Sequence, residues 1–304
     1  MLDIAVIIPA YNSGKYLGEA IESAMGQTLR PAEIVVVDDC STDGTRELAG
    51  AYGGIVELLA NERNAGPGYS RNRGVAHAKS RWIAFLDADD AWRKDHLERK
   101  AALLERYPEA PLAFGPQEGI GDWGGVWPPR LEKTGEPHDY FPAQLQGGVI
   151  QTSSILMRRD AFAEAGGFDE IVRFRGKRRV QAEDLDLTLK VCHRHPAVAD
   201  DQPTALYRGH VGQSYHLAVD QCIVSHEYRL RFLGSLTEEE RSRSRVKEGL
   251  RRLKTRWDLT LRHYWDVRDG RSLCRLVAYG LGRRLLRRET MPYAWRCALA
   301  PFRF

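Results

Sequence analysis

Apolar and polar residues alternate in blocks along the first hundred residues, and the blocks have two different periods. Segments of strand length, each built around an apolar run, lie at residues 4–10, 33–39, 55–61 and 81–90. Apolar residues at helical spacing, or residues typical of a helix start, lie at residues 13–29, 41–52, 66–78 and 95–107. The pattern therefore predicts four strands that alternate with four helices.

This alternation predicts the fold class. Strands that are apolar along their whole length are typical of parallel sheets, which are covered by helices on both faces and joined by right-handed crossovers. We therefore expect an α/β protein with a doubly wound, mainly parallel sheet flanked by helices. Ligands of such sheets bind beyond the carboxyl ends of the strands. The chain has its unusual polar residues there, at Asn12, Asp38, Asp39 and residues 87–90.

The pattern changes further along the chain, which indicates how the protein is divided. Residues 115–148 are rich in Gly, Pro and Trp and show no period, so we expect a long ordered loop or an irregular sheet. Beyond about residue 220 the pattern is helical. We predict one domain over residues 1–219, with halves at about 1–110 and 111–219, and a helical C-terminal extension over residues 220–304.

Charge separates the same two parts of the chain. The composition is ordinary for a globular protein, with 304 residues, 43% hydrophobic and 28% charged. Residues 220–304 contain 20 Lys and Arg against 10 Asp and Glu, whereas residues 1–219 contain 25 against 31. The basic residues of the extension are interspersed with Glu and Leu, which favours solvated amphipathic helices over a nucleic-acid-binding segment. Residues 273–304 pair Arg clusters with Leu, Trp and Phe, so contact with an anionic membrane surface and packing in a homodimer both stay open.

Cysteine spacing and the N-terminus bear on the compartment. The five cysteines, Cys40, Cys192, Cys222, Cys274 and Cys297, show no C-x-x-C spacing and suit a reducing environment. The first residues carry no basic region and have only a short apolar run, unlike a signal peptide. We expect a cytoplasmic protein, and we leave open peripheral attachment to the cytoplasmic face of the membrane.

Three aspartates crowd the end of the fourth predicted strand, in the run WIAFLDADDAW. Like charges at this spacing repel one another, so the run is either a strand end that leads into a solvated acidic loop or a site for a positively charged group such as a metal ion. Magnesium and manganese ions prefer such oxygen ligands. Alternation along an extended chain would place Asp87 and Asp89 on one side and Ala88 on the other. We therefore expect a divalent cation at this position, and a structural role for Asp90.

Other candidate residues each allow two interpretations from the sequence alone. Asp39 could accept a hydrogen bond from a nucleobase, or cap the following helix. Asp184 and Glu183 suit the start of a helix, and this alone would explain them. Gly66 and Gly68 let the backbone approach a ligand, but Arg71 replaces the third glycine of a dinucleotide-binding loop, which excludes that motif. His210 could be a surface residue or a metal ligand.

Seven motifs together resemble the family-2 glycosyltransferases, nucleotide-sugar enzymes with the GT-A fold. They occur in the family's order over about residues 4–214: VIIPAYN, VVVDDCSTDGT, NAGPGYSRNRG, FLDADD, GGFDE, AEDLDL and YRGHVGQS. Each motif alone is weak, whereas seven in register are specific. The extension after residue 220 contains no motif of comparable specificity.

The resemblance implies a role for each candidate residue. The residues implied to line the nucleotide site are Pro9, Ala10, Tyr11, Asn12, Asp39, Asn64, Gly66, Arg71, Asp87 and Ala88. Asp89 matches the metal-binding residue of the D-x-D motif, with Mn²⁺ or Mg²⁺ as the cation. His210 is a further candidate ligand. Asp184 matches the catalytic base, with Glu183 in support and able to contact the acceptor.

The resemblance also implies a reaction, which is inverting transfer of a sugar from a nucleotide-sugar, expected to be a UDP-sugar, to a hydroxyl group. A carbohydrate, a lipid-linked or another acceptor would be compatible, in polysaccharide or glycoconjugate synthesis of bacterial type. One alternative is a nucleotidyltransferase, although PAYNSGKY is a poor phosphate-binding loop. Nucleic-acid binding through the basic extension is another. A non-catalytic binding module is disfavoured by the intact D-x-D motif and Asp184.

Overall fold

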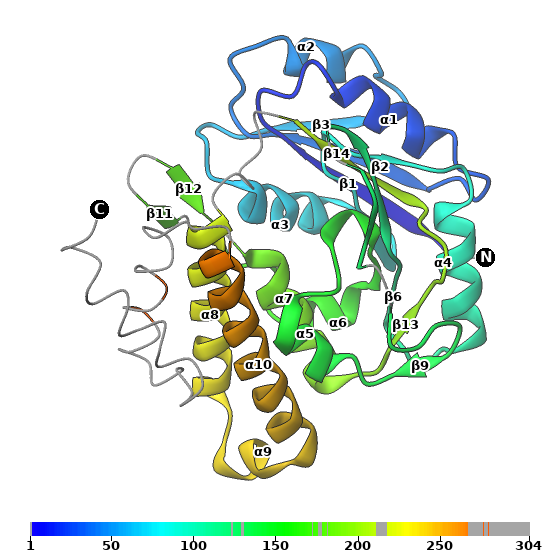
Figure 1. Cartoon of the computed structure of the whole chain (residues 1–304). Helices are drawn as coiled ribbons and strands as arrows, with labels where there is room; N and C mark the ends of the chain where they lie inside the picture. The colour runs from blue at the N-terminus through cyan, green and yellow to red at the C-terminus, as the bar shows by residue number, and fades with distance from the viewer. Residues whose placement is uncertain are drawn as a thin grey trace, which may run out of the picture. The chain divides into compact units, whose positions relative to one another are not determined.

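The computed structural model describes residues 2–122, 124–128, 131–171, 173–175, 178–180, 182–210 and 218–266, together with Leu276 and Tyr279. The chain forms two compact units (Figure 1). The first unit contains Met1–Tyr140, Val149–Arg173 and Glu183–Gln213. The second contains Phe141–Gly148, Phe174–Ala182 and Ser214–Phe304.

An eight-stranded sheet forms the centre of the first unit. Its strands in spatial order are β3 (Glu57–Ala60), β2 (Glu33–Asp38), β1 (Ile4–Ala10), β4 (Trp82–Phe85), β10 (Leu156–Arg158), β6 (Leu112–Phe114), β13 (Ala197–Ala199) and β9 (Pro137–His138). The first four strands are mutually parallel, and β10 is antiparallel to both of its neighbours. The predicted α/β class with a mainly parallel sheet is confirmed.

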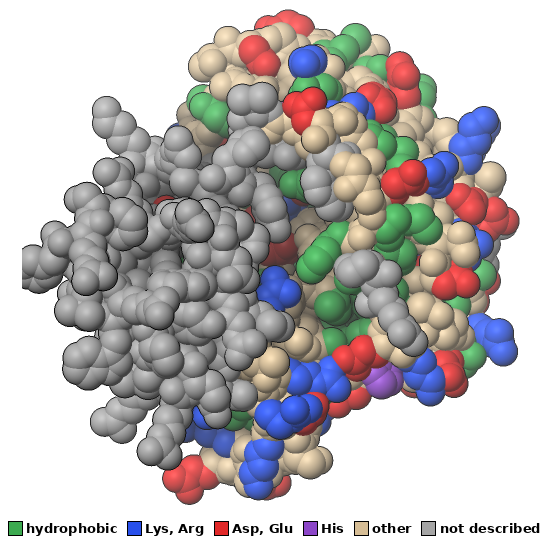
Figure 2. Space-filling view, viewed as in Figure 1, with side chains coloured by type: hydrophobic (Ala, Val, Ile, Leu, Met, Phe, Trp, Pro, Cys, Tyr) green, Lys and Arg blue, Asp and Glu red, His purple; other side chains and the backbone are tan. Residues whose placement is uncertain are grey.

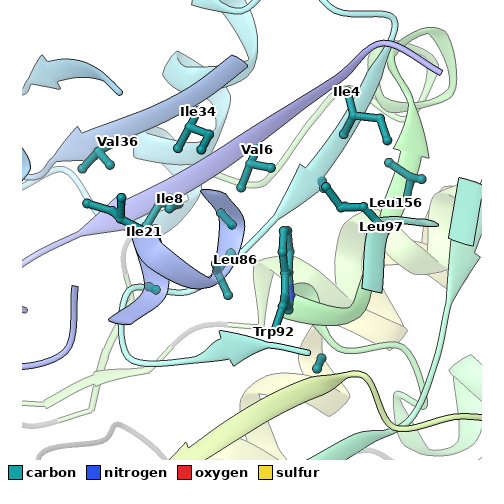
Figure 3. Close-up of a cluster of buried hydrophobic side chains, with 14 of the residues drawn as sticks. Ile4, Val6, Ile8, Ile21, Ile34, Val36, Leu86, Trp92, Leu97 and Leu156 are labelled. Atoms are coloured by element: carbon teal, nitrogen blue, oxygen red, sulfur yellow. The ribbon is translucent and has the colours of Figure 1, made fainter. Parts of the chain in front are cut away.

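Helices cover both faces of this sheet. On one face, α1 (Leu17–Met25) and α4 (His96–Arg106) share a buried apolar cluster with alternate residues of β1. Figure 3 shows Ile21 beside Ile8, and Leu97 beside Leu156 of β10. On the other face lies α3 (Pro67–His77). Gly74 lets α3 approach the sheet closely, because a Cβ there would lie 2.5 Å from Cγ2 of Ile7. The described part of this unit also contains the short helices α2 (Thr45–Gly50) and α6 (Arg159–Glu164) and the longer α7 (Glu183–Arg194).

A second, four-stranded sheet crosses the first unit. Its order is β5 (Ala91–Trp92), β14 (Ala205–Gly209), β7 (Gln117–Gly121) and β8 (Val126–Trp127). The Gly- and Trp-rich segment thus contributes short strands of an irregular sheet. Gly121 pairs with Gly209, and its φ of +73° together with a space of only 2.7 Å between a Cβ and the Gly209 carbonyl requires glycine. This pairing fixes the end of β14, immediately before His210.

The second unit is mainly helical. Its helices are α5 (Phe141–Gly147), α8 (Ala218–Ser235), α9 (Glu238–Ser242) and α10 (Ser244–Asp266), and β11 (Arg173–Arg175) pairs with β12 (Arg178–Val180). A capping box between Thr237 and Glu240 starts α9. Gly249 of α10 leaves room for Leu145 of α5, and Val246 and Leu253 are buried. The predicted helical extension is confirmed over residues 218–266.

The outer surface of α9 and α10 is rich in charge. Figure 2 shows Lys and Arg side chains gathered over these helices, with Asp and Glu among them. The exposed basic residues include Arg241, Arg243, Lys247, Arg251 and Lys254. Of the segment expected to contact a membrane, residues 273–304, all but Leu276 and Tyr279 lie outside the described residues. Across the described ranges, we find no helix long and apolar enough to span a bilayer.

Candidate functional site

The loops that follow β1 and β2 are tied to each other. The Asn12 backbone N–H donates to Ser41 Oγ at 2.9 Å, and Asn12 Oδ1 accepts from the Thr42 backbone N–H at 2.9 Å. Asn12 adopts a left-handed φ of 49°, which asparagine tolerates better than most residues. Pro9 and Ala10 end β1, and the Tyr11 side chain that follows is 47% exposed. The loop is therefore fixed while its tyrosine is free to meet a ligand.

Asp39 organises the next strand end. It is 2% exposed, and its carboxylate accepts hydrogen bonds from Asn61 Nδ2 (2.8 Å), Ala65 N (2.8 Å) and Gly66 N (2.7 Å). These bonds fix the loop between β3 and α3, in which Gly66 has a φ of 104° and Asn64 is exposed. The structure thus places Asp39, Asn64 and Gly66 together, with the Asp39 carboxylate engaged by the protein.

The aspartates after β4 lie in a turn, closed by a bond from Asp90 N to the Asp87 carbonyl at 3.0 Å, and not in the extended chain that the alternation assumed. The side chains of Asp87 and Asp89 are 33% and 31% exposed, whereas Ala88 and Asp90 are only 4% and 2% exposed. Asp89 Oδ2 lies 2.9 Å from Nε2 of His210, at the end of β14. Two residues separated by 121 positions in sequence are therefore side by side.

Asp90 is the buried member of this turn. Its Oδ2 accepts from the Ser153 hydroxyl at 2.6 Å, and its Oδ1 accepts from the Arg208 backbone N–H at 3.0 Å. Burial, followed by the charges of Asp87 and Asp89, raises the pKa of Asp90 well above its ordinary value. Its partners show a structural role, which the sequence predicted without identifying them.

Arg71 connects the two acidic parts of the site. Its side chain is 5% exposed, with Nη2 donating to Asp87 Oδ1 at 2.6 Å and Nη1 donating to Glu183 Oε1 at 2.8 Å. The guanidinium also lies 5.1 Å from the ring centroid of Phe168. Burial alone would lower the pKa of Arg71, but the charges of Asp87 and Glu183 outweigh it and raise that pKa. The arginine is therefore charged and held at two points.

Three carboxylates lie in the first turn of α7, where the helix macrodipole favours negative charge. Glu183 is bound to Arg71, and Asp186 forms an ion pair with Lys190 at 2.6 Å. Asp184 is partly exposed and accepts a hydrogen bond from the Leu185 backbone N–H at 2.7 Å. Burial of the carboxyl and the charge of Glu183 raise the pKa of Asp184 to about 6.

Several residues at the site were not found by sequence reasoning. Ser153 contacts the Asp87–Asp90 turn, and Arg208 donates from Nε to the Asp89 carbonyl at 2.9 Å. The ring of Tyr16 lies between the Arg208 guanidinium and the His210 ring, 5.1 Å from each. Arg208 lies inside the motif YRGHVGQS and could have been noticed there. Ser153 has no comparable signal.

The strand ends and the start of α7 in the first unit carry the candidate site residues. Asp39 follows β2, the Asp87–Asp90 turn follows β4, His210 follows β14, and Glu183 and Asp184 begin α7. Within the described ranges, Asp, Glu, His and Cys side chains do not gather in threes as a metal cluster would, so Asp89 and His210 form a pair. Such a pair can bind a cation whose remaining ligands come from a bound molecule and water.

Comparison with known proteins identifies the family. The model of the family described as glycosyl transferase family 2 matches residues 5–166, which is more than half of the chain. The chain belongs to glycosyl transferase family 2. This match favours a glycosyltransferase over a nucleotidyltransferase or a nucleic-acid-binding protein, the two alternatives that the sequence had left open.

Three known proteins are similar to this chain in sequence or in structure. The succinoglycan biosynthesis protein ExoO of Rhizobium meliloti is 48% identical over 105 residues, which cover 34% of this chain and 29% of ExoO. The chain thus spans less than half the length of that relative. Residues 1–349 of S. aureus TarS in complex with UDP-GlcNAc have a TM-score of 0.64 at 20% identity, over 97% of this chain and 79% of that TarS chain. The mannosyltransferase PcManGT from Pyrobaculum calidifontis, in complex with GDP-Man and Mn²⁺, has a TM-score of 0.60 at 16% identity, over 98% and 86%. These two structures establish the GT-A type fold.

Proposed function

We propose that this chain is an inverting glycosyltransferase that moves a sugar from a nucleotide-sugar, expected to be a UDP-sugar, to an acceptor hydroxyl. One observation carries the proposal: Arg71 joins Asp87, at the end of β4, to Glu183, which precedes Asp184. A candidate donor site and a candidate base therefore share one buried cation. Family membership supports the reaction class. The printed name of ExoO supports a role in the synthesis of a sugar polymer.

Asp184 is the proposed general base. It takes the proton of the acceptor hydroxyl while the hydroxyl oxygen attacks the anomeric carbon, and the nucleotide diphosphate leaves from the opposite face. A single displacement inverts the configuration and needs no covalent enzyme intermediate. A pKa of about 6 leaves the carboxylate mostly ionised at neutral pH and basic enough to accept the proton. Glu183 orients this end of α7 through its ion pair with Arg71. Because it directly precedes Asp184 in the chain, it would also be able to contact the acceptor.

The nucleotide-binding part of the proposal uses the fixed loops after the parallel strands. Pro9, Ala10, Tyr11 and Asn12 would line the base pocket. Asp39 binds the backbone of Ala65 and Gly66 in the facing loop, which also carries Asn64. Asp87 and Ala88 would meet the ribose, and Arg71 would stabilise the donor through its charge. All of these residues lie in the predicted domain of residues 1–219, which we therefore propose as the catalytic part. The cytoplasmic location stays a prediction.

Asp89 and His210 are the residues that would hold Mn²⁺ or Mg²⁺. Their facing atoms are 2.9 Å apart, and a carboxylate with an imidazole is a suitable donor pair. Two protein ligands suffice where phosphate oxygens and water complete the shell. When bound, the cation supplies positive charge that stabilises the leaving diphosphate. The Mn²⁺ in PcManGT, a structure with the same fold, supports this assignment.

The donor preference and the cation can be tested together on the full chain. Thermal-shift titrations would compare UDP-, GDP- and dTDP-sugars, each with Mn²⁺ and with EDTA. We expect a UDP-sugar with Mn²⁺ to give the largest rise in Tm, and NMR of the product to show an inverted anomeric configuration. Equal shifts for all three nucleotides, or full transfer activity in excess EDTA, would contradict the donor or the metal assignment respectively.

A further inference from the structure

The buried carboxylate of Asp90 joins segments of the chain that meet at the proposed cation site. One oxygen accepts from the Ser153 hydroxyl, and the other accepts from the Arg208 backbone N–H. The Ser153 hydroxyl in turn accepts from the Asp87 backbone N–H at 3.1 Å. We refer to Asp90, Ser153 and the Arg208 backbone as the Asp90 staple.

The staple lies next to both proposed ligands of the cation. Asp90 directly follows Asp89, and Arg208 precedes His210 by two positions. A second hydrogen bond, from Arg208 Nε to the Asp89 carbonyl at 2.9 Å, joins the same segments. The segments that carry Asp89 and His210 are therefore held together by bonds that neither ligand side chain makes, in addition to the direct contact between the two side chains.

Ser153 is itself fixed in the interior of the first unit. It is 1% exposed, and its carbonyl accepts from Trp92 Nε1 at 2.7 Å. The Trp92 ring is 4% exposed and stacks on His96, with ring centroids 4.3 Å apart and an interplanar angle of 9°. Because Trp92 binds its carbonyl, Ser153 has a fixed position from which its hydroxyl contacts the Asp87–Asp90 turn.

A carboxylate at this position needs a reason, because burying one beside Asp87 and Asp89 is unfavourable. An apolar residue would be less costly to bury but could not accept two hydrogen bonds from opposite directions. Partners outside the direct ligands of a metal commonly orient those ligands. We propose that Asp90 and Ser153 are positioning residues, which hold Asp89 and His210 at the separation that a divalent cation requires. This inference rests on the proposed cation-binding role of Asp89 and His210.

Two neighbouring serines allow a matched experiment. Ser154 is also buried, and its hydroxyl donates to the Gln151 carbonyl at 2.8 Å, away from the aspartates. The affinity of the full chain for Mn²⁺ would be measured by EPR in the presence of UDP. We expect Ser153→Ala to weaken Mn²⁺ binding by about tenfold or more, within the ~10–100-fold range of such outer partners. Ser154→Ala should change it by less than about twofold, because its hydroxyl makes no contact with the staple.

Asp90→Asn provides a second variant that keeps the size of the side chain. It can still accept from Arg208, but its amide cannot accept the Ser153 proton, so we expect weaker Mn²⁺ binding. Tm is measured for every variant. Wild-type Mn²⁺ affinity in folded Ser153→Ala and Asp90→Asn overturns the positioning role. Equal losses in Ser153→Ala and Ser154→Ala also overturn it, because they indicate general destabilisation.

A separate variant distinguishes failure of this inference from failure of the proposed function. Asp89→Ala removes a proposed ligand and should abolish the bound Mn²⁺ signal. If Asp89→Ala binds Mn²⁺ as the wild type does, the metal site itself is misassigned. If only Asp89→Ala loses Mn²⁺, the metal site stands and the positioning role of Asp90 and Ser153 is wrong.

Discussion

Two acidic clusters in this protein distribute their charges in the same way. Each has three carboxylates within four positions, Asp87, Asp89 and Asp90 in one and Glu183, Asp184 and Asp186 in the other. One member of each binds Arg71. Another is buried on a structural partner, Ser153 for Asp90 and Lys190 for Asp186. The clusters differ in the third member. The Asp89 carboxylate faces the His210 ring, whereas the Asp184 carboxylate accepts a hydrogen bond from the backbone N–H of the next residue, Leu185.

This difference indicates how one fold obtains two chemical functions from the same residue type. A carboxylate paired with an imidazole suits a cation. A carboxylate that is partly shielded beside another negative charge has a raised pKa and suits proton transfer. In both clusters the other two carboxylates are held by Arg71 or by a structural partner, whereas the third is not. The environment, more than the residue, therefore separates the roles.

The largest expected effect follows from removing the available carboxylate of the second cluster. Asp184→Asn keeps the shape of the side chain and the acceptor for Leu185, but it cannot take a proton. We expect kcat to fall by roughly 10²–10⁴-fold, with the Kd for UDP unchanged. Steady-state kinetics and calorimetry would measure the two quantities. Asp186→Asn is the control, with kcat reduced by less than about tenfold, and near wild-type turnover in Asp184→Asn would refute the base assignment.

Removing Arg71, which binds a carboxylate of each cluster, should lower the stability of the folded protein. Arg71→Met leaves Glu183, which is 9% exposed, and Asp87 without their cation. Removing one partner of a buried ion pair costs about 3–5 kcal/mol, so we expect a loss of that order in the free energy of unfolding by urea. Adding Glu183→Gln to Arg71→Met should return part of this loss, because one uncompensated charge disappears.

An exposed pair in the same unit is the control for Arg71. Arg93 contacts Glu118, and their side chains are 51% and 37% exposed. Exposed pairs contribute about 0–1 kcal/mol, so Arg93→Met should cost far less than Arg71→Met. Similar costs for the two variants would mean that Arg71 does not hold the clusters together energetically.

Much of the fold could be predicted because several strands are visible in the sequence as apolar runs. The continuous apolar runs at β1, β2 and β4 match strands at the expected positions, and the parallel order follows from the helices between them. The antiparallel strand β10 could not be found in this way, because three residues are too few to show a period. Its placement between β4 and β6 depends on tertiary packing, which overrides local pattern.

For the candidate site too, the sequence predicted some features and not others. Asp87, Asp89 and Asp184 could be selected because they stand at the ends of predicted elements within motifs. Two contacts that hold the site together could not be selected in this way, because Arg71 and Glu183 are 112 positions apart and Asp90 and Ser153 are 63 apart. Local periodicity contains no information on contacts at such separations. The partners that hold Asp90 and Glu183 therefore became visible only in three dimensions.

The smallest expected effect concerns the pH at which the second cluster becomes active. The base must be ionised, and the pKa of Asp184 is raised to about 6, first by burial and then by Glu183. We therefore expect kcat/KM to fall about tenfold per pH unit below pH 6 and to level off above it. Glu183→Gln removes the second cause, so the acidic limb should move to lower pH. The residual activity of Asp184→Asn should lack this limb, because the carboxylate that must be ionised has been removed. A limb that stays in place in Glu183→Gln would show that the two neighbouring carboxylates are not electrostatically linked.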